Sequence, residues 1–106
     1  MNLIEKRDKL NLNCERGLIT VRETNLLFVS YMIEASSDDE AVALFRTSPP
    51  ELRLSFCEWL REMKEHEYHY RWFGAGDQRT MDEVESDGQR HQSLLQRIAP
   101  IILGLP

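Results

Sequence analysis

Residues 20–33 decide the fold and read TVRETNLLFVSYMI. Thr20 and Glu23 have the spacing of a capping box, in which each side chain binds the other's free backbone N–H at the start of a helix. The apolar side chains that follow lie on nearly every face of a helix, which is typical of a central helix in a bundle. The stretch therefore predicts a helix over residues 21–35 at the centre of an all-α domain.

The same start signal recurs along the chain. It is present at residues 37–40 and 48–51, and the second of these places Pro49 at the first helical position, where proline is favoured. Residues 80–83 are a fourth candidate, with Asp77 as a competing start. Together these signals predict one compact bundle, a single domain over residues 1–106, with five helices over residues 2–15, 21–35, 38–46, 49–70 and 78–98.

Glycine and proline indicate where these helices end. Gly17 is placed to end the first helix in a left-handed cap, and Pro100 to end the last. Gly88 predicts a kink within the last helix, because glycine costs about 1 kcal/mol relative to alanine there. The last two helices carry apolar residues at alternating spacings of four and three, which predicts packing at shallow angles. The apolar tail from Ile98 onward is expected to dock within the bundle.

Charge and apolar patterning argue against several classes of protein. The chain has 18 acidic and 13 basic residues and a net charge of −5, and its basic residues are interleaved with acids. We therefore expect no nucleic-acid binding, which needs a basic face. The densest apolar run is too short to cross a membrane, and no signal-peptide pattern is present. These features predict a cytoplasmic protein in which Cys14 and Cys57 are reduced, packed thiols.

Glu62, His66 and His69 are weak candidates for metal ligands. Glu62 precedes His66 by four residues, so the two could reach one ion from the same helical face. The zinc-protease pattern needs two histidines four apart, whereas these two are three apart. A solvated helix face is the preferred interpretation, and a metal-dependent enzyme is kept as an alternative. With no nucleophile elbow or phosphate-binding loop, the sequence predicts no catalytic residue and no cofactor.

Aromatic and arginine side chains cluster in residues 70–73, just before a break at residues 74–76. Such side chains dominate binding hot spots, because they bury a large area at a small cost in entropy. The alternative is that Trp72 and Phe73 fold back on the bundle as the hydrophobic contact of a helix end. The candidate partner-binding residues are Tyr70, Arg71, Trp72 and Phe73.

Residues 17–23, which read GLITVRE, resemble the turn of SHOCT-like short helical modules. The same turn, paired with the PPEL helix start at residues 49–52, looks like that of uncharacterised small bacterial helical proteins. In SHOCT-like modules this helical hairpin is thought to mediate oligomerisation or partner contact. The similarity covers a small part of the chain, and a SHOCT module is much shorter. The resemblance implies an interaction role.

The leading hypothesis is a small non-catalytic protein-interaction or regulatory adaptor module, which binds another protein or a second copy of itself. The first alternative is an immunity- or inhibitor-type protein, in which acidic residues at 34–40 and 77–87 bind a basic partner. A helix-turn-helix over residues 10–33 is the least favoured, because its second helix is too apolar to lie in a DNA groove.

Overall fold

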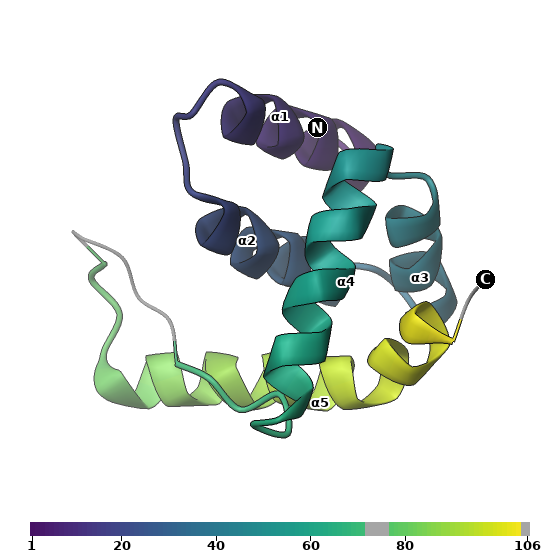
Figure 1. Cartoon of the computed structure of the whole chain (residues 1–106). Coiled ribbons are helices and arrows are strands. Elements are labelled where there is room, and N and C mark those ends of the chain that lie inside the picture. Colours follow the sequence, from purple (N-terminus) through teal and green to yellow (C-terminus); the bar gives the residue numbers. More distant parts are fainter. Residues whose placement is uncertain (72–76, 105–106) are drawn as a thin grey trace.

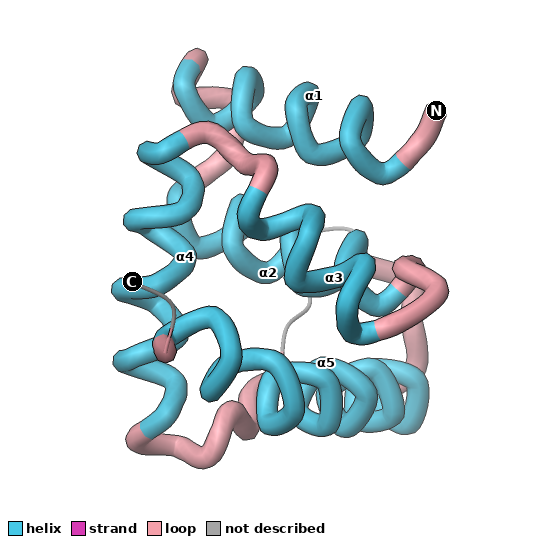
Figure 2. Tube along the Cα trace, turned by 90° about the vertical axis from the view of Figure 1, so that its right-hand side faces the viewer, coloured by secondary structure: helices cyan, strands magenta, loops and turns pink. Residues whose placement is uncertain are grey.

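The computed structural model describes residues 1–71 and 77–104, and within them the chain forms five helices and no strand. The helices are α1 (Leu3–Glu15), α2 (Val21–Ile33), α3 (Asp38–Arg46), α4 (Pro50–Lys64) and α5 (Met81–Leu103). The predicted all-α class is confirmed. In Figures 1 and 2, α2 and α3 lie between α1 and α5, and α4 runs along one side of this stack. Because α4 crosses α5 steeply in both views, the predicted shallow packing of these two helices is wrong.

The core is built around α2, as the sequence predicts. Phe28 and Val29 of this helix have no exposed surface. The ring of Phe28 packs edge-on against Phe56 of α4, with 4.9 Å between the ring centroids. Leu95 and Ile98 bring α5 into the same apolar cluster. A helix that contacts the others on several faces is therefore the element that holds the bundle together.

Three of the four helix-start signals are used, and one is not. The side chains of Thr20, Ser37 and Thr80 each accept the predicted backbone hydrogen bond, and Thr80 with Glu83 forms a complete capping box. The predicted cap at Ser48 is wrong, because Pro49 is the N-cap of α4 and Pro50 its first residue. The Ser48 hydroxyl donates instead to the carbonyl oxygen of Leu44, 2.7 Å away. Ser48 thus satisfies the end of α3 rather than the start of α4.

The ends of the helices differ more from the prediction. Gly17 has a φ of +72°, in agreement with the predicted left-handed cap. α2 ends at Ile33, two residues early, and α4 ends at Lys64 instead of residue 70. After α4 the chain reverses through Glu67 and Tyr68, which both have a positive φ. This reversal places Tyr68, only 8% exposed, in the apolar core.

The last helix passes through Pro100 and Gly88 without ending. α5 continues to Leu103, so the predicted stop at Pro100 is wrong. Ile98 and Ile102 are buried on the same face, and this burial stabilises the extra turn. The final turns bend away from the axis of the first ones (Figure 1), as expected where proline removes one hydrogen bond from the helix.

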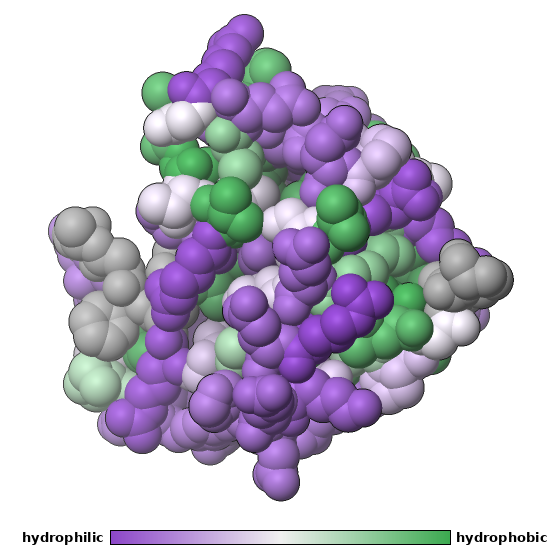
Figure 3. Space-filling view, viewed as in Figure 1, coloured by the Kyte–Doolittle hydropathy of each residue, from purple (hydrophilic) through white to green (hydrophobic). Residues whose placement is uncertain are grey.

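The face shown in Figure 3 is mostly hydrophilic. On this face, apolar side chains lie in separate groups, and the lower part over α5 is largely polar. None of the helices in the described part of the chain has the length and apolar character needed to span a membrane. Cys14 and Cys57 are both free and partly buried.

Candidate functional site

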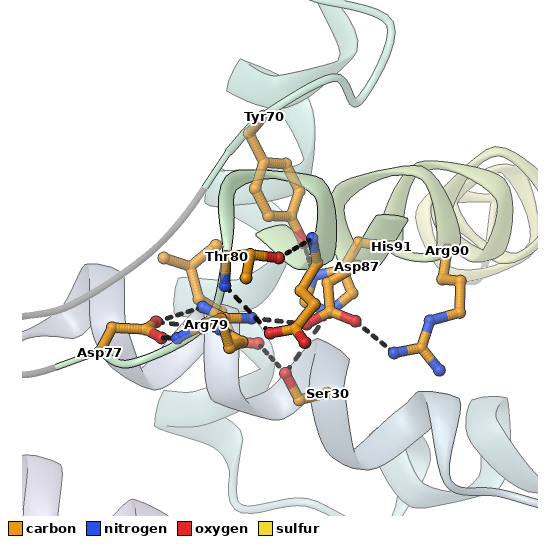
Figure 4. A network of polar contacts seen from close by, with 10 residues as sticks. Ser30, Tyr70, Asp77, Arg79, Thr80, Asp87, Arg90 and His91 are labelled. Carbon is orange, nitrogen blue, oxygen red and sulfur yellow. Dashed lines mark hydrogen bonds and ion pairs between the residues drawn. The ribbon is translucent and has the colours of Figure 1, made fainter. Parts of the chain in front are cut away.

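A polar pocket lies where α2 and α5 meet the described residues before α5, among them Tyr70 and Arg79 (Figure 4). Its volume is about 270 Å³. The lining combines hydroxyl, imidazole, guanidinium and carboxylate groups: Ser30, Glu34, Tyr70, Arg79, Asp87, Arg90 and His91, with Ile33, Val84 and Gly88. One of the predicted contact residues, Tyr70, therefore lines this pocket.

Tyr70 reaches the pocket because the chain turns back after α4 and crosses α5. The amide of Gln92 on α5 donates to the carbonyl oxygen of Glu67 at 3.1 Å, which ties the reversal to the helix. Further along, the carbonyl oxygen of Tyr70 lies so close to Gly88 that a Cβ there would stand 2.8 Å from it. The Tyr70 ring packs edge-on against Trp59, with 5.6 Å between centroids.

His91 joins α2 to this segment through both of its ring nitrogens. Its Nδ1 is 2.5 Å from the Tyr70 hydroxyl, and its Nε2 is 3.5 Å from the Ser30 hydroxyl. Ser30 also donates to the carbonyl oxygen of Leu26 at 3.2 Å, so its own proton is already used. All three groups are satisfied when Tyr70 donates to Nδ1 and Nε2–H donates to Ser30. We call Ser30, Tyr70 and His91 the His91 network.

Burial keeps the His91 network neutral. It lowers the pKa of His91 to about 4, against a smaller opposing influence from Asp87. The nearby Arg90 and Arg79 lower this pKa further. Burial also raises the pKa of the Tyr70 hydroxyl above its ordinary value. At neutral pH the imidazole and the phenol are therefore both uncharged, as the hydrogen-bond assignment requires.

A second set of contacts closes the pocket on the α5 side. The Arg79 guanidinium bonds to Asp77 at 2.5 Å and to Asp87 at 2.6 Å, and so fixes the segment before α5 to the helix. Asp87 also bonds to Arg90 one turn further along. The hydrogen bond from Arg90 lowers the pKa of Asp87 most, and that from Arg79 adds to it. These carboxylates act as internal partners of arginine.

The geometry does not favour nucleophilic catalysis. An activated serine needs a base that accepts its proton and a carboxylate that orients that base. Here Ser30 donates to a helix carbonyl, and the group on the other side of His91 is the phenol of Tyr70. An imidazole with a pKa near 4 is also a weak base at neutral pH. The His91 network therefore acts as a structural tie between three parts of the chain.

The other predicted site residues are dispersed. Arg71 is exposed and bonds to Glu85 at 2.7 Å, while Trp72 and Phe73 lie outside the described residues. Glu62 is on α4, but His66 and His69 follow its end, so the helical spacing behind the proposed metal pair is absent. Among the residues that the structure describes, no three His, Cys, Asp or Glu side chains are grouped to hold a metal ion.

No sequence pattern indicated Ser30, Arg79 and His91 as a group. The sequence indicated His91 only as one position in the apolar repeat of the last helix, and no motif or spacing indicated Ser30. Arg79 did have a signal in the sequence. It lies two residues after Asp77 and eight residues before Asp87, so an acidic partner is present on each side of it. The full arrangement depends on contacts between residues up to 61 positions apart, as for Ser30 and His91.

Comparisons with known proteins add no relationship. No protein-family model matches the chain, and neither a curated protein nor a solved structure is significantly similar to it.

Proposed function

We propose that this protein is a small non-catalytic interaction or regulatory module that binds another protein through the segment of Tyr70–Phe73. The proposal rests on the different environments of two adjacent residues, Tyr70 and Arg71. Tyr70 is held in the pocket by His91, whereas Arg71 projects with 55% of its side chain exposed and lies against Glu85. A contact segment fixed at its base loses less entropy on binding than a free one.

The acidic alternative receives less support from the structure. Most acids in the two stretches already have a partner within the chain, since Glu34 pairs with Lys6 and Asp38 with Arg97. Asp77 and Asp87 are likewise bonded to Arg79. A basic partner would have to displace these arginines and lysine before it could bind. An inhibitor that masks a basic surface would gain more from unpaired carboxylates.

A capture experiment with matched variants tests the proposal. Immobilised wild-type protein and three variants, Arg71→Ala, Trp72→Ala/Phe73→Ala and Arg46→Ala, are exposed to native lysate, and the bound proteins are identified by mass spectrometry. Arg46 is an exposed arginine on α3, away from the pocket, so it controls for loss of charge. We expect a specific protein to bind the wild type and Arg46→Ala but to be reduced with Arg71→Ala and lost with Trp72→Ala/Phe73→Ala.

Folding of each variant is checked by circular dichroism, so that loss of binding is read only from folded protein. Equal capture by all variants would place the contact elsewhere on the surface. If no protein is captured, sedimentation at increasing concentration tests the remaining form of the proposal, in which the partner is a second copy. A chain that then stays monomeric at all concentrations would overturn the proposal.

A further inference from the structure

A second concavity lies between the first turns of α2 and the middle of α4, apart from the polar pocket. Its volume is about 320 Å³. We call it the α2/α4 groove. Trp59 forms part of its wall, and the opposite rim carries Val21, which is 57% exposed. Met63 adds a flexible apolar side chain to the same wall. The groove therefore offers apolar surface that the fold leaves uncovered.

The floor of the groove holds a buried amide with an unused acceptor. Asn25 is only 2% exposed, and its Oδ1 has no hydrogen-bond partner. Its Nδ2 donates to the Ser55 hydroxyl across a long 3.5 Å, and Ser55 lines the groove as well. Buried side-chain oxygens in folded proteins nearly always accept a hydrogen bond, because leaving one unpaired is unfavourable. Asn25, which lines the groove, thus brings an unpaired acceptor to it.

Two carboxylates stand above this amide on the α4 side. Glu58 and Glu62 are one helical turn apart, both are exposed, and both line the groove. Within the described part of the chain neither of them forms an ion pair. They differ in this respect from the acids around the polar pocket. Arg22 contributes the opposing charge on the α2 rim, so the three ionised groups sum to −1.

The chemistry of the lining defines the ligand. Hydrogen-bond acceptors come from both helices: the amide oxygen of Asn25 from α2, and the carboxylates of Glu58 and Glu62 from α4. A cation with several N–H donors is complementary to such a lining. The apolar wall is complementary to the aliphatic stem of a long cationic side chain. A guanidinium can donate to acceptors on two sides at once through its planar fork, which the compact ammonium of lysine does less well. We propose that the α2/α4 groove binds the side chain of an arginine presented by a partner protein.

This inference is independent of the proposed function, because it concerns other residues and is tested with a small probe. The probe is N-acetyl-arginine amide, added to ¹⁵N-labelled protein and followed by NMR. N-acetyl-citrulline amide is the matched probe, since it has nearly the same shape and no charge. We expect arginine amide to shift the Asn25 side-chain amide and the Trp59 indole signal. Citrulline amide should bind at least about tenfold more weakly, because it lacks the charge-assisted hydrogen bonds.

Variants on the two rims should act in opposite directions. Glu58→Gln/Glu62→Gln is expected to weaken binding of arginine amide, and Arg22→Gln to strengthen it, since it removes a like charge. Both changes are at exposed positions, so the fold should be retained. Glu51→Gln/Glu65→Gln, two exposed acids that do not line the groove, is the matched control and should leave binding unchanged.

Three results would overturn the inference. The first is that saturating arginine amide leaves the Asn25 and Trp59 signals in place. The second is equal binding of the arginine and citrulline probes, which would show a groove without selectivity for charge. The third is an equal effect of the groove variants and the control pair, which would reduce the interaction to general attraction by an acidic protein.

Discussion

The carbonyl oxygen of Tyr70 lies 2.8 Å from the point that a Cβ on Gly88 would occupy. Real Cβ atoms do not approach backbone oxygen so closely, so the segment can cross α5 here only because residue 88 is glycine. The sequence predicted a kink at this glycine within the last helix, and α5 runs through residue 88 as one continuous helix. Gly88 is thus explained by the close approach of another part of the chain.

Replacement of Gly88 by alanine should therefore destabilise the protein, although alanine is the better helix former. We expect a loss of about 1–3 kcal/mol, as is usual when extra volume is forced into a packed contact. Urea unfolding of Gly88→Ala measures it, with Gln89→Ala on the exposed side of α5 as the control. Stabilisation by Gly88→Ala, the ordinary result at a free helical glycine, would contradict the close crossing.

The hydroxyl of Tyr70 should also contribute to stability through His91. Tyr70→Phe removes the donor 2.5 Å from Nδ1 and leaves a buried nitrogen without a partner. The expected cost is about 1–3 kcal/mol. Tyr31→Phe is the matched control, because the Tyr31 hydroxyl forms no hydrogen bond within the described residues. Equal stability of the two variants would show that the Tyr70–His91 bond contributes nothing.

Helix starts were largely predictable, because a cap depends on residues three positions apart. Thr20, Ser37 and Thr80 each satisfy a neighbouring backbone N–H, whatever the rest of the fold does. The predicted cap at Ser48 was wrong because two prolines follow this residue and its hydroxyl donates instead to the carbonyl oxygen of Leu44. Local chemistry therefore specifies a start well unless a second local partner competes.

Helix ends and the site were less predictable, because they depend on contacts distant in sequence. The pattern after Lys64 continues a helical repeat, yet the burial of Tyr68 in the core favours a reversal with positive φ values. No spacing rule relates Ser30 to His91, which meet only once α2 and α5 are packed. Tyr70 was identified for its residue type, but its hydrogen bond to His91 could not be foreseen.

The buried imidazole predicts a pH dependence of stability. The pKa of His91 is about 4 in the folded chain and about 6.5 when unfolded, so the unfolded state binds the proton first as pH falls. The contribution of neutral His91 is fully present above pH 6.5 and is lost progressively between pH 6.5 and 4, by on the order of 3 kcal/mol. Unfolding of wild type and His91→Gln across this range should show a difference in stability that shrinks towards low pH. A constant difference would contradict neutral burial.

Arg7 should be among the residues on which the packing of α1 depends most. It is 4% exposed, and its guanidinium donates to the carbonyl oxygen of Leu44 at 3.0 Å and to the Thr47 hydroxyl at 2.7 Å. Arg7→Met keeps the apolar stem but removes these donors at the C-terminal end of α3, where a positive charge is favourable.

We expect Arg7→Met to lower the free energy of unfolding by about 2–4 kcal/mol. The loss should hardly depend on salt, because the Arg7 guanidinium is itself buried and these two acceptors are uncharged. Arg16→Met, at an exposed position just after α1, is the control and should stay within about 0.5 kcal/mol of wild type. A large loss that disappears at high salt would point instead to the neighbouring Asp8, which bonds to the same guanidinium at 2.8 Å and is 57% exposed.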